Sequence, residues 1–186
     1  MTEENIQPSG GLSEAGIADF IHDWRTKTMS AVPRDGLSFS DLMWTRIYRQ
    51  CPSLRAVEGM LIFRVHHGGG DEPTLSEYDD FGDNQQEAFR EDHRRWVRQS
   101  DLRSIRFDGH WVSFTKTPKA LCSPYFASKG LRGFVIVQKV KKAVDISDIE
   151  AWGAVNEENE VVAPLEESQV VEILSFSEFE NKYCKQ

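Results

Sequence analysis

The sequence predicts an α+β fold in which helices come first and mainly antiparallel strands follow. Three observations support this prediction. The first 50 residues contain two stretches with apolar residues at helical spacing, whereas most strand-like stretches lie after residue 110. Too few helical crossovers separate the strands for a doubly wound parallel sheet. The chain of 186 residues is long enough for one domain with a sizeable core.

Composition and charge exclude several classes of function. The formal net charge of −8 argues against general binding to a phosphate backbone, so no nucleic-acid partner is expected. The polar N-terminus lacks a secretory signal, and no stretch approaches the ~20 apolar residues needed to cross a bilayer. We therefore expect a cytoplasmic or otherwise intracellular protein without a membrane partner. Its three widely spaced cysteines are expected to be buried or idle thiols.

The N-terminal region predicts a tail and two helices. Residues 1–11 end in Pro-Ser-Gly-Gly and predict a flexible tail, followed by a single domain over 12–186. Ser13 can cap a helix with apolar residues at helical spacing, namely Ile17, Phe20, Ile21 and Trp24. Ser38 and Asp41 form a pattern like a capping box, with Asp in place of the usual Glu, at the start of a second helix. The apolar residues of this helix are Leu42, Met43, Ile47 and Tyr48.

The remaining elements are mostly strands. Residues 61–65 form an apolar run that predicts a buried strand, followed by an acidic loop over 68–84 and a polar helix over 85–100. Thr117 and Pro118 predict the start of a short helix, and Ser147 with Glu150 forms a capping-box pattern. Further strands are predicted over 110–117, 133–140, 160–163 and 169–176.

Arg64 is the one charged residue inside the apolar strand over 61–65. An unpaired buried guanidinium is costly, so its side chain must reach an anion. That anion is either a carboxylate of the acidic loop, which is a structural pair, or a phosphate or carboxylate of a ligand.

Two pairs of polar residues are spaced two apart, so each pair lies on one face of its predicted strand. Ser113 and Thr115 can brace a polar neighbour or bind a ribose. Glu158 and Glu160 place two carboxylates side by side before an apolar segment. Taken alone, each pair is also typical of a solvated strand.

An early arginine, a middle hydroxyl pair and a late Glu-x-Glu together resemble the R-S-E signature of mono-ADP-ribosyltransferases, which include toxins and arginine-specific enzymes. The matching stretches are Phe63-Arg64, Trp111 to Thr115, and Glu158 to Pro164. The resemblance covers about residues 58–176. It implies a mixed, mainly antiparallel two-sheet core over about 58–186, with a helical lobe over about 12–57.

The resemblance also implies roles for individual residues. Glu160 would stabilise the cationic ribose formed as NAD loses nicotinamide, and Glu158 would position or deprotonate an acceptor, for which arginine is the first choice. Arg64 would hold an NAD phosphate or brace the site. Ser113 would orient Glu160, Thr115 would support the pocket, and Phe114 would reshape the nicotinamide ribose site. The expected partners are NAD, as substrate, and an unknown protein acceptor.

Two alternatives remain open at this point. One is a catalytically inactive domain of the same fold that serves interaction or regulation, and the other is an NAD glycohydrolase without a protein acceptor. A metal site is not expected, because the adjacent His66 and His67 point to opposite faces of a strand and no carboxylate has a ligand spacing.

Overall fold

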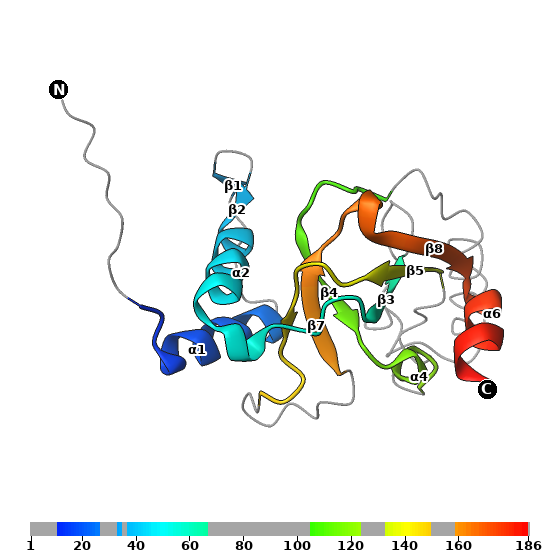
Figure 1. Ribbon diagram of the computed structural model, residues 1–186, viewed down its shortest axis with the longest axis horizontal. Helices are drawn as coiled ribbons and strands as arrows, with labels where there is room; N and C mark the ends of the chain where they lie inside the picture. The colour runs from blue at the N-terminus through cyan, green and yellow to red at the C-terminus, as the bar shows by residue number, and fades with distance from the viewer. Residues whose placement is uncertain are drawn as a thin grey trace, which may run out of the picture.

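The computed structural model describes residues 11–26, 33–34, 37–66, 105–123, 133–149 and 159–185 (Figure 1). Helices α1 (Glu14–Thr26) and α2 (Phe39–Gln50) precede the strands of the main sheet, which confirms the α+β class. The predicted tail up to residue 10, the acidic loop over 68–84 and the helix over 85–100 lie outside the described residues.

Six strands form one antiparallel sheet among the described residues, in the order β6-β7-β4-β3-β5-β8. Their bounds are β3 (Leu61–His66), β4 (Trp111–Thr115), β5 (Phe134–Lys139), β6 (Val144–Asp145), β7 (Glu160–Pro164) and β8 (Val170–Ser175). The antiparallel character agrees with the expectation. A division into two sheets is not shown, although β3 and β4 are joined by the single register pair Phe63 and Thr115.

Helix α1 begins as its sequence predicts. The Ser13 hydroxyl accepts a hydrogen bond from the Gly16 amide at 3.0 Å, which is an N-cap contact. Ile17, Phe20 and Ile21 are buried against the sheet and α2. Burying three large apolar side chains fixes this helix to the domain, since each contributes about 1.5–3 kcal/mol.

Helix α2 packs through three of its four predicted apolar residues, since Ile47 is in the core and Met43 and Tyr48 pack against it. Trp44 and Ile47 are fully buried, whereas Leu42 is 47% exposed. Asp41 is also buried, and its carboxylate accepts a hydrogen bond from the Trp111 amide at 2.8 Å. Asp41 therefore joins α2 to the first residue of β4, a role that the capping-box pattern does not reveal.

The Asp41 carboxylate also contacts Nδ1 of His110, and this hydrogen bond is the main cause that raises the pKa of His110. A raised pKa in the folded protein means that the contact stabilises the fold below the ordinary pKa of about 6.5 and is lost as pH rises through the folded value. We expect a stabilisation on the order of 0.5 kcal/mol, because His110 is half exposed and solvent screens the charge.

The measurement is the free energy of unfolding between pH 5 and pH 9 for the parent protein and for His110→Gln. The difference between the two should shrink as pH rises. A difference that is constant across this range would show that protonated His110 does not stabilise the fold.

The C-terminal segment forms a helix that the sequence reading missed. Ser175 caps α6 (Phe176–Phe179) in a capping box with Glu178, and a π-helical turn, η5 (Glu180–Cys184), follows. Phe179 is fully buried beside Phe63 at 5.7 Å between ring centroids. In Figure 1 α6 lies at the β8 end of the sheet, away from α1 and α2.

The cysteine prediction is wrong for two of the three residues. Cys122 and Cys184 form a disulfide that joins the end of α4 (Pro118–Leu121) to η5. Cys51 is free. The pairing was invisible in the sequence because 62 positions separate the two residues and the intervening strands bring them together.

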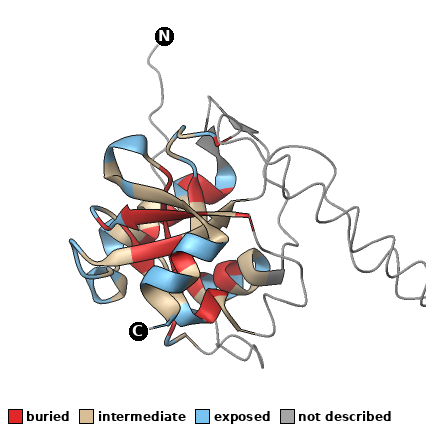
Figure 2. Ribbon diagram, turned by 90° about the vertical axis from the view of Figure 1, so that its right-hand side faces the viewer, coloured by how far each residue is buried: buried red, intermediate tan, exposed pale blue. Residues whose placement is uncertain are grey.

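The short elements complete the fold. A hairpin of β1 (Pro33–Arg34) and β2 (Leu37–Ser38) precedes α2, and two 3₁₀ turns follow later, η1 (Pro52–Leu54) and η4 (Glu167–Gln169). Buried residues gather on the central strands and on the inner sides of the helices (Figure 2). The core therefore lies on both faces of the sheet.

Candidate functional site

The three strands that carry the arginine, the hydroxyl pair and the late glutamate are neighbours in the sheet, in the order β7-β4-β3. Thr115 lies directly opposite Glu160 in the β4–β7 ladder. Thr115 also pairs with Phe63, the residue before Arg64. Stretches that are far apart in the sequence therefore meet at one joint of the sheet.

The register determines which side chains share a face. Residues directly opposite in an antiparallel ladder project to the same side, and successive residues alternate. Ser113, Thr115 and Glu160 therefore belong to one face, while the Cβ atoms of Arg64 and Phe114 leave the other. Arg64 and Glu160 lie on strands that β4 separates, and they do not share a face of the sheet.

Phe114 does not have the position expected for it. It is 3% exposed and packs in the core cluster that contains Ile136 and Val161. Its role is therefore to fill the core behind the site. The expectation that Phe114 reshapes a ribose site is wrong, because strand alternation turns it away from Thr115 and Glu160.

Arg64 reaches across the joint between β3 and β4. Its Nη1 donates a hydrogen bond to the backbone carbonyl of Ser113 at 2.9 Å. Burial lowers the pKa of Arg64, and no carboxylate of the described residues pairs with it. Burial, together with the Arg64 charge, also lowers the pKa of His66. The contact braces β4 against β3, and within the described part of the chain the other guanidinium donors have no hydrogen-bond partner.

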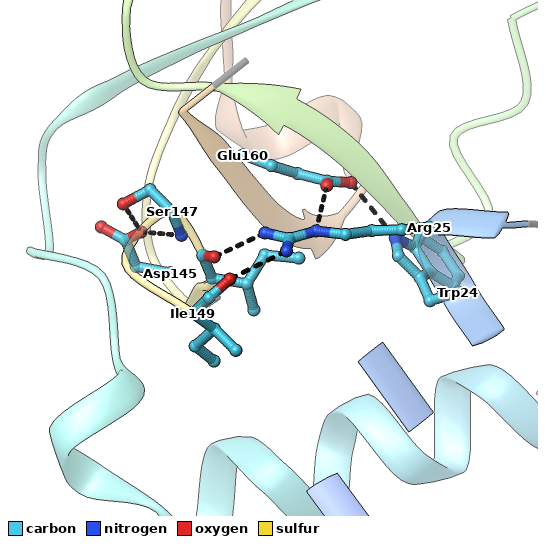
Figure 3. A network of polar contacts seen from close by, with 7 residues as sticks. Trp24, Arg25, Asp145, Ser147, Ile149 and Glu160 are labelled. Atoms are coloured by element: carbon cyan, nitrogen blue, oxygen red, sulfur yellow. Dashed lines mark hydrogen bonds and ion pairs between the residues drawn. The ribbon is translucent and has the colours of Figure 1, made fainter. Parts of the chain in front are cut away.

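The Glu160 carboxylate is held by helix α1 (Figure 3). Its Oε1 accepts a hydrogen bond from Trp24 Nε1 at 3.2 Å, and Oε2 accepts one from Arg25 Nε at 3.4 Å. Glu160 is 7% exposed. Within the described residues, no hydrogen bond joins Ser113 to Glu160. The carboxylate is held by Trp24 and Arg25, and not by Ser113 as expected.

Thr115 uses its hydroxyl locally. Its Oγ1 donates to the Thr117 carbonyl at 3.2 Å and accepts from the Thr117 amide at 3.1 Å. These bonds shape the turn between β4 and α4. Thr115 therefore shapes the end of β4 opposite Glu160, and its expected role in supporting a ligand pocket stays a prediction.

The strand carrying Glu160 begins at that residue. Asn159 has φ of 46°, in the left-handed region that asparagine tolerates better than most residues. An extended strand does not continue backwards through this conformation, so the argument that Glu158 and Glu160 share a face fails. Glu158 itself lies outside the described residues.

A second polar cluster lies beside the start of β7. Lys116 Nζ donates to Asp145 Oδ2 at 2.9 Å and to Ser147 Oγ at 2.6 Å, and its backbone amide donates to the Asn159 carbonyl at 3.1 Å. Burial raises the pKa of Asp145, but hydrogen bonds from Lys116 and Ser147 outweigh this and hold it below its ordinary value. The cluster fixes β6 and the end of β4 around the residue before Glu160.

The sequence reading missed Trp24, Arg25 and the Lys116 cluster. Trp24 lies in the apolar stripe of α1, which predicts a core position, and Arg25 follows it in the last turn of the same helix. Contacts between α1 and Glu160 span 136 and 135 positions, so no local pattern signals them. The only available hint is a buried strand that starts with a glutamate and needs a cation.

Comparison with models of protein families, with curated proteins and with solved structures finds no match for this chain. Among the described helices, none is long and apolar enough to span a membrane. The same part of the chain contains no group of three His, Cys, Asp or Glu side chains suited to a metal ion.

Proposed function

We propose that this chain is a mono-ADP-ribosyltransferase that transfers ADP-ribose from NAD to a protein side chain and releases nicotinamide. The observation that supports the proposal is the adjacency of β3, β4 and β7, with Thr115 opposite Glu160. Three separate motifs of the R-S-E signature need such an arrangement in order to act on one ligand. A two-sheet core, divided at the weak joint between β3 and β4, is part of the same proposal.

The proposed chemistry needs one fixed anion. The bond between the ribose C1′ and the nicotinamide nitrogen breaks, and its electron pair goes to that nitrogen, which becomes neutral. Glu160 stabilises the positive charge that develops on the ribose. A nucleophilic nitrogen of the acceptor then bonds to C1′ and loses a proton. Arg64 braces β4 through the Ser113 carbonyl, and the guanidinium donors that have no partner among the described residues suit an NAD phosphate.

A second candidate is a non-catalytic domain of the same fold. The specific observation in its favour is that Glu160 is 7% exposed and already bound to Arg25 and Trp24. The opposite strand faces of Arg64 and Glu160 also fit a site without turnover. This candidate predicts a protein that does not consume NAD and whose free energy of unfolding does not rise when NAD is added.

Incubation of the purified protein with NAD labelled in the adenylate, with and without a cell lysate, tests the proposal. Release of nicotinamide together with label on protein is expected from the transferase. Nicotinamide with free labelled ADP-ribose would favour a glycohydrolase. Intact NAD under both conditions would overturn the enzymatic proposal and favour the non-catalytic domain.

A further inference from the structure

We infer that Arg25 is a positioning residue that holds the Glu160 carboxylate in place for catalysis, with Trp24 as its second support. This inference rests on the proposed function. No motif of the resemblance includes either residue, since both belong to α1, about forty positions before the first motif strand.

The Arg25 guanidinium is held by hydrogen bonds on all of its nitrogens. Its Nε donates to Glu160, its Nη1 to the Ile149 carbonyl at 2.9 Å, and its Nη2 to the Ile146 carbonyl at 2.7 Å. All three nitrogens therefore have partners, and the planar guanidinium has a fixed orientation. Arg25 links α1, the turn after β6 and the start of β7 (Figure 3).

The ion pair of Arg25 and Glu160 is largely buried. The side chains of Arg25 and Glu160 are 12% and 9% exposed, so bulk water screens their pair much less than it screens a surface pair. A carboxylate in such surroundings is costly without a cation beside it. Arg25 is the cation that the described residues place there.

Trp24 supports the same carboxylate from a fixed position. Its ring packs edge-to-face against Trp44 at 5.2 Å between centroids, and Trp44 is fully buried. The indole Nε1 is therefore held in one direction, toward Oε1 of Glu160 at 3.2 Å. Each carboxylate oxygen receives one donor from α1, and an ionised carboxylate can accept about four, so capacity remains for a substrate hydroxyl.

Burial of helix α1 in the core favours a positioning role for Arg25 over an inhibitory contact that opens and closes. Ile17, Phe20 and Ile21 bury α1 in the same core cluster as Trp111 and Val162 of the sheet. Moving α1 away from Glu160 would expose these side chains. Arg25 therefore remains bound to Glu160 during turnover, and its effect falls on the transition state, where the fixed charge matters most.

The experiment compares nicotinamide release by the parent protein, Arg25→Gln, Arg25→Lys and Trp24→Phe. For Arg25→Gln we expect kcat to fall about 10-fold or more while KM for NAD changes less than about 3-fold, because a misplaced carboxylate loses transition-state stabilisation rather than ground-state binding. Arg25→Lys keeps the charge and should recover part of the loss. Trp24→Phe removes only the indole donor and should lower kcat a few-fold.

The matched control is Arg49→Gln, which changes an exposed arginine in the last turn of α2. It should leave kcat and KM unaltered. Circular dichroism checks the fold of each variant. If Arg25→Gln does not fold, Arg25→Lys and Trp24→Phe decide the question by the same comparison, a fall in kcat with little change in KM.

The possible failures are distinguishable. A folded Arg25→Gln protein with the kcat of the parent would overturn the positioning role and leave the proposed function intact. A rise in kcat would show that Arg25 is inhibitory instead. If the parent releases no nicotinamide, both the proposed function and this inference are wrong.

Discussion

Glu160→Gln should reduce nicotinamide release about 100-fold or more and leave the fold intact, because removal of one transition-state contact in an enclosed site costs about 10²–10³ in kcat. Glutamine has the shape of glutamate, so its amide oxygen can still accept from Trp24 or Arg25. What it lacks is the negative charge that faces the developing ribose cation.

Folding of this variant is expected to survive for a structural reason. Without the negative charge, Arg25 loses its ion pair with residue 160, but its Nη1 and Nη2 keep the carbonyls of Ile149 and Ile146. We therefore expect a lower melting temperature with an unchanged circular dichroism spectrum.

The matched control is Glu167→Gln, an exposed glutamate in η4 just after the same strand. This control should release nicotinamide at the rate of the parent. A Glu160→Gln protein with the activity of the parent would remove the catalytic assignment of Glu160 altogether.

The second large effect is expected at Trp44, where substitution by alanine should cost about 3–5 kcal/mol of unfolding free energy. Trp44 is fully buried, and its ring lies 4.9 Å from that of Phe20 and 6.4 Å from that of Trp111. Removing it leaves a cavity between α1, α2 and β4. Because Trp24 also packs on Trp44, the support of Glu160 should weaken as well.

Trp44→Phe is the matched variant for this site. It keeps an aromatic ring, and it removes an indole N–H that has no hydrogen-bond partner among the described residues. We expect it to cost clearly less than alanine. Urea unfolding of both variants measures the difference, and equal costs would show that ring packing is not what stabilises this cluster.

The strands were predictable because their signals are local. The apolar runs over 61–65, 133–140 and 160–163 became β3, β5 and β7 with bounds that differ by at most one residue at each end. The hydroxyl of Ser13 and the stripe of α1 gave its start and its buried side. Each of these features depends on residues within a few positions of one another.

The site was predictable only in part, since its decisive contacts are long-range. The resemblance implies that Arg64, Ser113 and Glu160 act in one site. The strand order β7-β4-β3 places their strands together, but Arg64 leaves the opposite face of the sheet from Ser113 and Glu160. The support of Glu160 by α1 was not foreseeable, because polar pairing across more than a hundred positions leaves no pattern in the sequence. The placement of Glu158 relied on an extended chain, and the left-handed Asn159 breaks that assumption.

A crystal structure of the protein with a non-hydrolysable NAD analogue would show whether Glu160 faces the ribose that loses nicotinamide. We expect the nicotinamide-bearing ribose within hydrogen-bond distance of a Glu160 carboxylate oxygen, about 2.6–3.2 Å, with Arg25 and Trp24 still bound to that carboxylate. An analogue bound away from β4 and β7, or no binding at millimolar concentration, would contradict it.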